Sequence, residues 1–177
     1  MSKAVVKEVG SIRLAGLGLV VLFIVVFPAF AAGQANGNNL TINVPVRLKE
    51  AKVVFNIDHL AFEGDEPTGL QFMRVMIERF RADGTAAQIV AIFHGAAGYM
   101  LLGDVTYDKV RNWQQGNPYK DQIAGLIRSG VSVEECAETM RANHWRNADL
   151  LPGIKVNTGA NFRIVQLVQE GFVQLQP

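Results

Sequence analysis

The chain has 177 residues, of which 49% are apolar, and this is enough for one domain with a hydrophobic core rather than a disordered segment. Its 17 basic and 16 acidic residues leave a net charge of +1, and they form no run of like charge that is typical of an interaction tail. This balance excludes the basic surface that nucleic-acid binding requires.

The first 31 residues have the three parts of a secretory signal peptide. Three basic residues lie within positions 3–13, the run 14–27 carries no charge, and Pro28 precedes a site of small residues at 29–31. We therefore expect cleavage after Ala31 and a periplasmic or otherwise exported location. Cleavage would leave 14 basic and 15 acidic residues, so the mature chain would carry a net charge of −1.

An uncleaved membrane anchor is the alternative, because the apolar run 14–32 is close to the roughly 20 residues that span a bilayer. In either case the rest of the chain lies outside the cytoplasm, and after cleavage we expect no membrane contact. Residues 32–43 are rich in small and turn-forming types, which predicts a flexible linker. A single α/β domain is then expected over 44–177.

Buried strands and amphipathic helices alternate along this domain. The first half is expected to contain a strand at 52–58, a helix at 68–81, a strand at 88–93, a short apolar helix at 99–102 and an irregular excursion at 103–118. The second half is expected to contain a helix at 119–129, a strand at 131–135, a helix at 136–143, a strand at 154–157, a helix at 160–170 and a strand at 172–175. This alternation predicts a three-layer α/β sandwich with a mainly parallel sheet of about five strands.

Four residues capable of proton or sulfur chemistry follow the predicted strands. Asp58 and His59 close the first strand, His94 closes the second, and Cys136 closes the third at the start of its helix. Ligand sites in open parallel sheets lie beyond the carboxyl ends of the strands, so these four side chains are the candidate catalytic residues.

Cys136 is the only cysteine, and an unpaired thiol in an oxidising compartment is a liability unless it is buried or used. Backbone amides at a helix start favour the thiolate. The neighbouring Glu134, Glu135 and Glu138 act the other way, because negative charges raise the pKa of a thiol. The sequence leaves this balance open, and a buried packing residue is the ordinary role of a free cysteine.

Other chemistries lack a sequence signature. No two histidines have the spacing of a metal site, and the motifs GxGxxG, GxxxxGK[ST] and GxSxG are absent. We therefore expect no metal and no cofactor.

Four segments, in order along the chain, resemble the DsrE/DsrF-like proteins. They are KVVFNID from Lys52, IVAIFHGAAGYMLL from Ile89, LIRSGVSVEECAETM from Leu126 and LLPGIKVNTGANFRIVQLVQEGFVQLQP from Leu150. In the sulfur-relay subunits of this family, of the DsrE and TusD type, the cysteine that accepts a persulfide sulfur follows a Gly-Val turn and a short strand and opens a helix. The segment GVSVEECA at 130–137 is similar to that arrangement.

The resemblance implies an exported sulfur carrier or sulfurtransferase that accepts sulfur as a persulfide on Cys136, with sulfur donor and acceptor proteins as partners. It also implies a homo-oligomer, a trimer or a hexamer, for which four aromatic residues outside the strand cores are candidate anchors: Trp113, Tyr119, Trp145 and Phe162. These rings could instead fill the core. The alternative function is a non-enzymatic periplasmic ligand-binding or assembly protein with an inert, structural Cys136.

Overall fold

The computed structural model describes residues 40–177. The expected signal peptide and all but the last four residues of the expected linker lie outside the described residues. Residues Asn43–Pro177 form one compact unit. In the part of the chain that is described, no helix has both the length and the apolar character needed to cross a bilayer.

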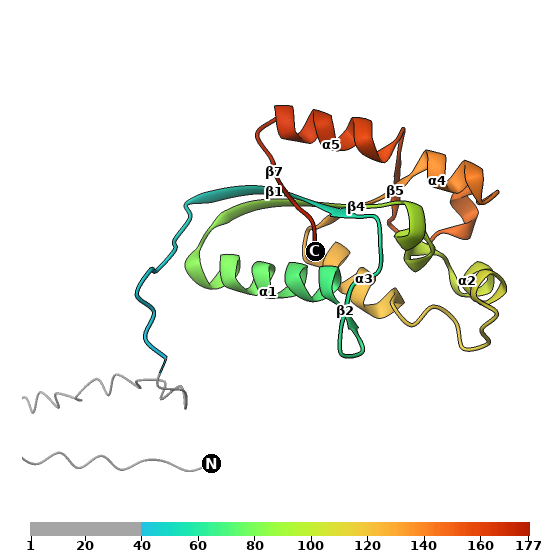
Figure 1. Cartoon of the computed structure of the whole chain (residues 1–177), viewed down its shortest axis with the longest axis horizontal. Helices are drawn as coiled ribbons and strands as arrows, with labels where there is room; N and C mark the ends of the chain where they lie inside the picture. The colour runs from blue at the N-terminus through green and yellow to red at the C-terminus, as the bar shows by residue number, and fades with distance from the viewer. Residues whose placement is uncertain (1–39) are drawn as a thin grey trace, which may run out of the picture. The chain divides into compact units, whose positions relative to one another are not determined.

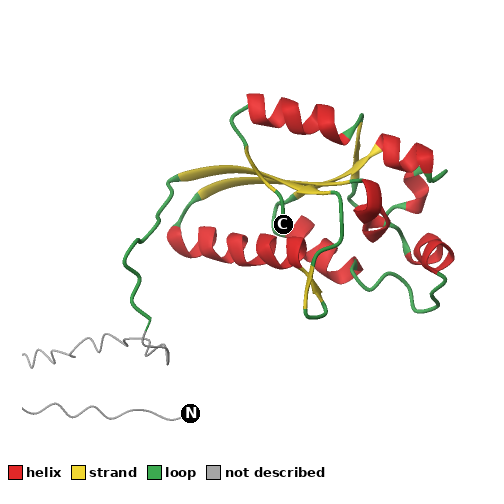
Figure 2. Ribbon diagram, viewed as in Figure 1, coloured by secondary structure: helices red, strands yellow, loops and turns green. Residues whose placement is uncertain are grey.

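A five-stranded sheet forms the middle layer, and all of its strands are parallel (Figure 2). The strands lie side by side in the order β6 (Lys155–Asn157), β5 (Ser132–Cys136), β4 (Ala86–Phe93), β1 (Glu50–Ile57) and β7 (Val173–Leu175). β1 and β4 pair along their whole length at the centre. The predicted three-layer α/β sandwich with a parallel sheet of about five strands is confirmed.

Helices cover both faces of the sheet (Figure 1). α1 (Thr68–Asp83) and α3 (Lys120–Arg128) pack on one face, and α5 (Ala160–Gln169) packs on the other. At the carboxyl ends of the strands lie the 3-10 helix η1 (Gly95–Leu101), α2 (Asp104–Arg111), α4 (Ala137–Ala142) and the 3-10 turn η2 (Asn147–Asp149).

Strand side chains alternate between two hydrophobic cores, as the pleat of a sheet covered on both faces requires. On β1, Val53 and Phe55 belong to the larger core against α1 and α3, whereas Val54 belongs to the smaller core against α5. Cys136 at the end of β5 lies in the smaller core together with Ile164 of α5. The sulfur is therefore on the α5 side of the sheet.

Two parts of the chain differ from the expected pattern. The excursion expected at 103–118 contains α2, in which Tyr107 is the only buried residue, so its sequence lacks an apolar stripe. The connection between β1 and α1 contains a short antiparallel hairpin of β2 (Phe62–Glu63) and β3 (Glu66–Pro67) that was not predicted.

Candidate functional site

A cavity of about 440 Å³ opens at the carboxyl ends of the strands. Its lining includes His94 and Gly95 after β4, Cys136 at the end of β5, Thr139 of α4 and Ala160 of α5. This is the edge at which parallel sheets bind ligands, so the cavity is the candidate functional site.

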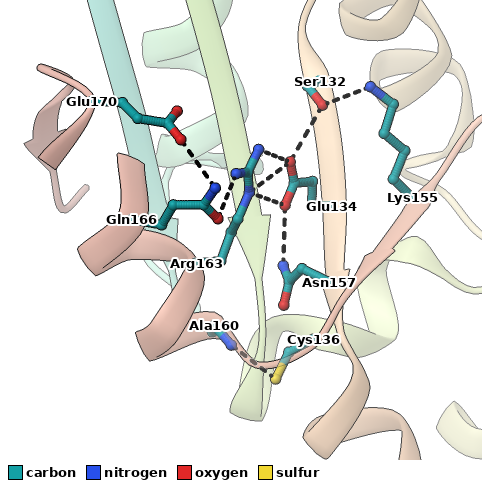
Figure 3. A network of polar contacts seen from close by, with 9 residues as sticks. All are labelled: Ser132, Glu134, Cys136, Lys155, Asn157, Ala160, Arg163, Gln166 and Glu170. Atoms are coloured by element: carbon teal, nitrogen blue, oxygen red, sulfur yellow. Dashed lines mark hydrogen bonds and ion pairs between the residues drawn. The ribbon is translucent and has the colours of Figure 1, made fainter. Parts of the chain in front are cut away.

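Cys136 is placed by two elements at once. It is the last residue of β5 and the N-cap of α4, which begins at Ala137, one residue later than the sequence predicted. Its Sγ accepts a hydrogen bond from the backbone N–H of Ala160, the first residue of α5, at 3.3 Å (Figure 3). The sulfur therefore lies where two helices begin.

The environment of the sulfur favours its ionised form. Burial raises the pKa of the Cys136 thiol, but the backbone N–H groups of Thr139, Ala160 and Glu138, with the Thr139 side chain, outweigh burial and hold the pKa below its ordinary value. The residue is nevertheless only 4% exposed. The site thus combines a thiol of lowered pKa with restricted access.

Glu134, the first of the three neighbouring acids, is neutralised by a partner. Its carboxylate lies on the same face of β5 as the sulfur and forms a two-pronged ion pair with Arg163 of α5, with Nε at 3.0 Å from Oε2 and Nη2 at 3.1 Å from Oε1. Arg163 thereby compensates the negative charge that lies nearest to the sulfur along the strand.

The other two acids also present no unpaired charge to the sulfur. Glu135 points to the opposite face of β5 and is fully buried, and burial raises the pKa of its carboxyl to about 9, so this group is neutral at pH 7. Glu138 lies on the exposed surface of α4 and pairs with Arg141. The structure therefore answers the question that the sequence left open: the pKa of the Cys136 thiol is lowered, not raised.

The neutral Glu135 carboxyl supports the backbone of the site. Its Oε1 accepts a hydrogen bond from the Cys136 N–H at 3.2 Å, and its Oε2 has no hydrogen-bond partner among residues 40–177. A Cβ at Gly98 of η1 would lie 2.9 Å from Oε1 and 2.8 Å from the Cγ2 of Thr139. Only glycine therefore allows η1 to pack this closely over the carboxyl and the start of α4.

His94 lies at the cavity in its neutral form. Burial lowers the pKa of His94, and the charge of Asp58 opposes this only in part. Its Nε2 lies 2.7 Å from Asn56 Oδ1, and the Asn56 amide Nδ2 donates to Gln176 Oε1 at 2.7 Å. Because Asn56 Oδ1 can only accept, Nε2 carries the proton and Nδ1 keeps a free lone pair.

Asp58 and His59 lie outside the cavity lining. His59 Nδ1 contacts Asp58 Oδ1 at 2.5 Å, and this hydrogen bond is the main cause of the lowered pKa of Asp58. Gln176 Nε2 donates to the same oxygen at 2.7 Å. A chain of amides thus links Asp58 to His94, and its members, Asn56 and Gln176, were not singled out from the sequence.

The four candidate interface aromatics fall into two groups. Tyr119 and Trp145 pack against the larger core, which is the core-filling role. Trp113 and Phe162 remain exposed, at 46% and 80%, and Phe162 also lines the cavity. Among residues 40–177, no group of three His, Cys, Asp or Glu side chains is arranged to hold a metal ion.

No family model matches the chain, and no curated protein matches it. The solved structures that are similar to it include MTH1491, a protein of unknown function from Methanobacterium thermoautotrophicum, with 23% identity and a TM-score of 0.56, and the ychN protein from E. coli, with 16% identity and a TM-score of 0.51. Each match covers 72% of this chain and 99% of the other. Both support the α/β fold expected from the DsrE/DsrF resemblance, and at these identities the likeness shows the fold alone.

Proposed function

We propose that this protein is an exported sulfur carrier or sulfurtransferase that holds sulfur as a persulfide on Cys136. The observation that carries the proposal is the contact of Sγ with the Ala160 N–H at 3.3 Å, at the wall of a cavity of about 440 Å³. Backbone donors at a helix start stabilise a bound anion, and a persulfide is a sulfur anion one atom longer than the thiolate.

The transfer is a thiol exchange reaction in which atoms and electrons balance. The Cys136 thiolate attacks the outer sulfur of a donor persulfide or polysulfide, a sulfur–sulfur bond forms at Cys136, the bond within the donor breaks, and the donor leaves as a thiolate or a shorter polysulfide. An acceptor thiolate then attacks the outer sulfur and regenerates the Cys136 thiolate. His94 lines the same cavity, and its unprotonated Nδ1 is suited to receive the proton of an incoming thiol.

A second function is favoured by one observation. Cys136 is 4% exposed and belongs to the smaller hydrophobic core, as a structural cysteine would. A non-enzymatic ligand-binding or assembly protein would use the cavity without involving the sulfur. Accessibility separates the two functions, because a carrier thiol must react with a small reagent in the folded protein.

The test is the intact mass of the purified protein before and after incubation with inorganic polysulfide. We expect the gain of one sulfur atom per chain, its loss on reduction, and no gain in Cys136→Ser. Serine keeps an acceptor for the Ala160 N–H, so this variant should remain folded. A wild-type protein that gains no sulfur, and whose thiol resists a small alkylating reagent until it is denatured, would establish the structural role instead.

A further inference from the structure

An ion pair of low exposure joins the two elements that meet at the sulfur. The Arg163 guanidinium binds both carboxylate oxygens of Glu134, and the exposed fractions of the two side chains are 27% and 5% (Figure 3). Such a pair fixes geometry as well as charge, because the planar guanidinium fork matches a carboxylate in one orientation only.

The positions of the two partners relate this ion pair to Cys136. Arg163 lies one helical turn after Ala160 on α5, and Glu134 lies two residues before Cys136 on β5. Residues two apart on a strand share a face, so Glu134 and the sulfur both point toward α5. The ion pair therefore connects the same helix turn and the same strand end as the contact between the Ala160 N–H and Sγ.

A third side chain extends this network toward the sulfur. Asn157 of β6 is the register partner of Cys136, and its Nδ2 donates to Glu134 Oε2 at 3.3 Å. A carboxylate only accepts, so the amide nitrogen must face Glu134 and the amide oxygen must face away from it. Asn157 is 9% exposed, and its Oδ1, which lies on the Cys136 side of the amide in Figure 3, has no hydrogen-bond partner among the described residues.

We propose that Arg163, acting through Glu134, is the positioning residue of the sulfur site, because the ion pair holds the first turn of α5, and with it the Ala160 N–H, against the sulfur. The thiolate accepts from this N–H, and Asn157 ties Glu134 to the strand that pairs with the end of β5. The effect of Arg163 on sulfur transfer rests on the proposed function. Its effect on the geometry around Cys136 does not depend on that function.

Plain electrostatics is the competing explanation. Five ionisable groups lie near the sulfur in the chain or around the cavity: His94 after β4, Glu134 and Glu135 on β5, Glu138 on α4 and Arg163 on α5. Replacing Arg163 by lysine separates the two explanations, because lysine keeps the positive charge but has no guanidinium fork. A purely electrostatic role would survive this change, and a positioning role would not.

The experiment measures the pH profile of thiol reactivity with a small alkylating reagent, and the initial rate of sulfur uptake from inorganic polysulfide, in the full-length protein. In Arg163→Lys the profile should move to higher pH, and both rates at neutral pH should fall about tenfold, which is the order of effect of one lost hydrogen bond to a charged group. Arg141→Lys is the matched control, because Arg141 also pairs with a glutamate two residues from Cys136 but on the exposed surface. Its profile should match that of the wild type.

A second variant separates the same two explanations by the sign of the shift. Glu134→Gln removes a negative charge near the sulfur, so plain electrostatics moves its profile to lower pH, whereas loss of the two-pronged ion pair moves it to higher pH. Equal profiles for wild type and Arg163→Lys would overturn the positioning role, as would a shift to lower pH in Glu134→Gln. If the wild type takes up no sulfur, the carrier function fails, whereas the alkylation profiles still decide whether Arg163 positions the site.

Discussion

Replacing Glu135 by glutamine should make the protein more stable at neutral pH. The carboxyl is fully buried and burial raises its pKa to about 9, against an ordinary value of 4.5. The folded protein therefore keeps the proton up to about pH 9, while the unfolded chain releases it above about pH 4.5. The stability that this group contributes is fully present below about pH 4.5 and is lost progressively as the pH rises toward 9.

The stability lost at a given pH follows from how far that pH lies above the pKa of Glu135 in the unfolded chain. Each pH unit above the unfolded pKa costs about 1.4 kcal/mol, so the free energy of unfolding at pH 7 is lowered by about 3 kcal/mol. Glutamine cannot ionise, has the shape of the protonated acid, and keeps an oxygen that can accept from the Cys136 N–H. The variant should therefore recover most of this loss.

Urea unfolding of both proteins between about pH 5 and pH 8 measures the effect. The stability of the wild type should fall relative to Glu135→Gln by about 1.4 kcal/mol per pH unit, and groups common to both proteins cancel in the difference. Glu138→Gln is the control, since Glu138 is exposed and its curve should run parallel to that of the wild type. Parallel curves for Glu135→Gln and the wild type would refute the conclusion that the buried carboxyl stays protonated.

Three further predictions concern the site, the N-terminus and the assembly. His94→Ala should slow sulfur uptake from polysulfide without preventing it, because a neutral imidazole assists the thiol rather than carrying sulfur; unchanged rates would exclude this assistance. Protein isolated from its native host should begin at Ala32 on N-terminal sequencing, and a chain that begins at Met1 or Ser2 would instead establish a retained anchor. Sedimentation at micromolar concentration should show a homo-oligomer, a trimer or a hexamer, to which the exposed ring of Phe162 contributes, and a lone monomer would contradict this assembly.

The fold could be predicted because its signals are local. β1 and β4 are apolar runs covered on both faces, and α1 has a clear apolar stripe, so their periods are visible in the sequence. The strand limits were predicted to within two residues of those observed. α2 escaped prediction because Tyr107 is its one buried residue, so the helix has no apolar stripe that a sequence pattern could reveal.

The candidate site was predictable only in part, because its contacts join distant segments. Cys136 and His94 line one cavity because they follow adjacent parallel strands, whose carboxyl ends lie at the same edge of the sheet. The donor to the sulfur is a backbone N–H from α5, 24 residues later in the chain, and no side-chain type signals it. Asn56 and Gln176 are 120 residues apart in the chain. Nothing in the sequence indicates that these two amides would join each other and link His94 to Asp58.

The acids around the sulfur illustrate why sequence distance misjudges electrostatics. Glu134, Glu135 and Glu138 are all within two residues of Cys136, and counted together they predict a raised thiol pKa. Strand alternation sends Glu135 to the opposite face, where burial removes its charge, and the start of α4 turns Glu138 toward solvent. Only Glu134 shares a face with the sulfur, and Arg163 neutralises it.

Burial of Cys136 agrees with the carrier function as well as with a structural one. A persulfide loses its outer sulfur to any thiol that reaches it, so a carrier needs a site that admits a small sulfur anion and excludes larger thiols. The Cys136 sulfur is 4% exposed at the wall of a cavity of about 440 Å³, with backbone donors around it, so the approach of a thiol to it is restricted. On the proposed function, a protein acceptor would have to insert a narrow, extended segment into this cavity, and substitutions in its lining should affect release of sulfur to proteins more than loading from inorganic polysulfide.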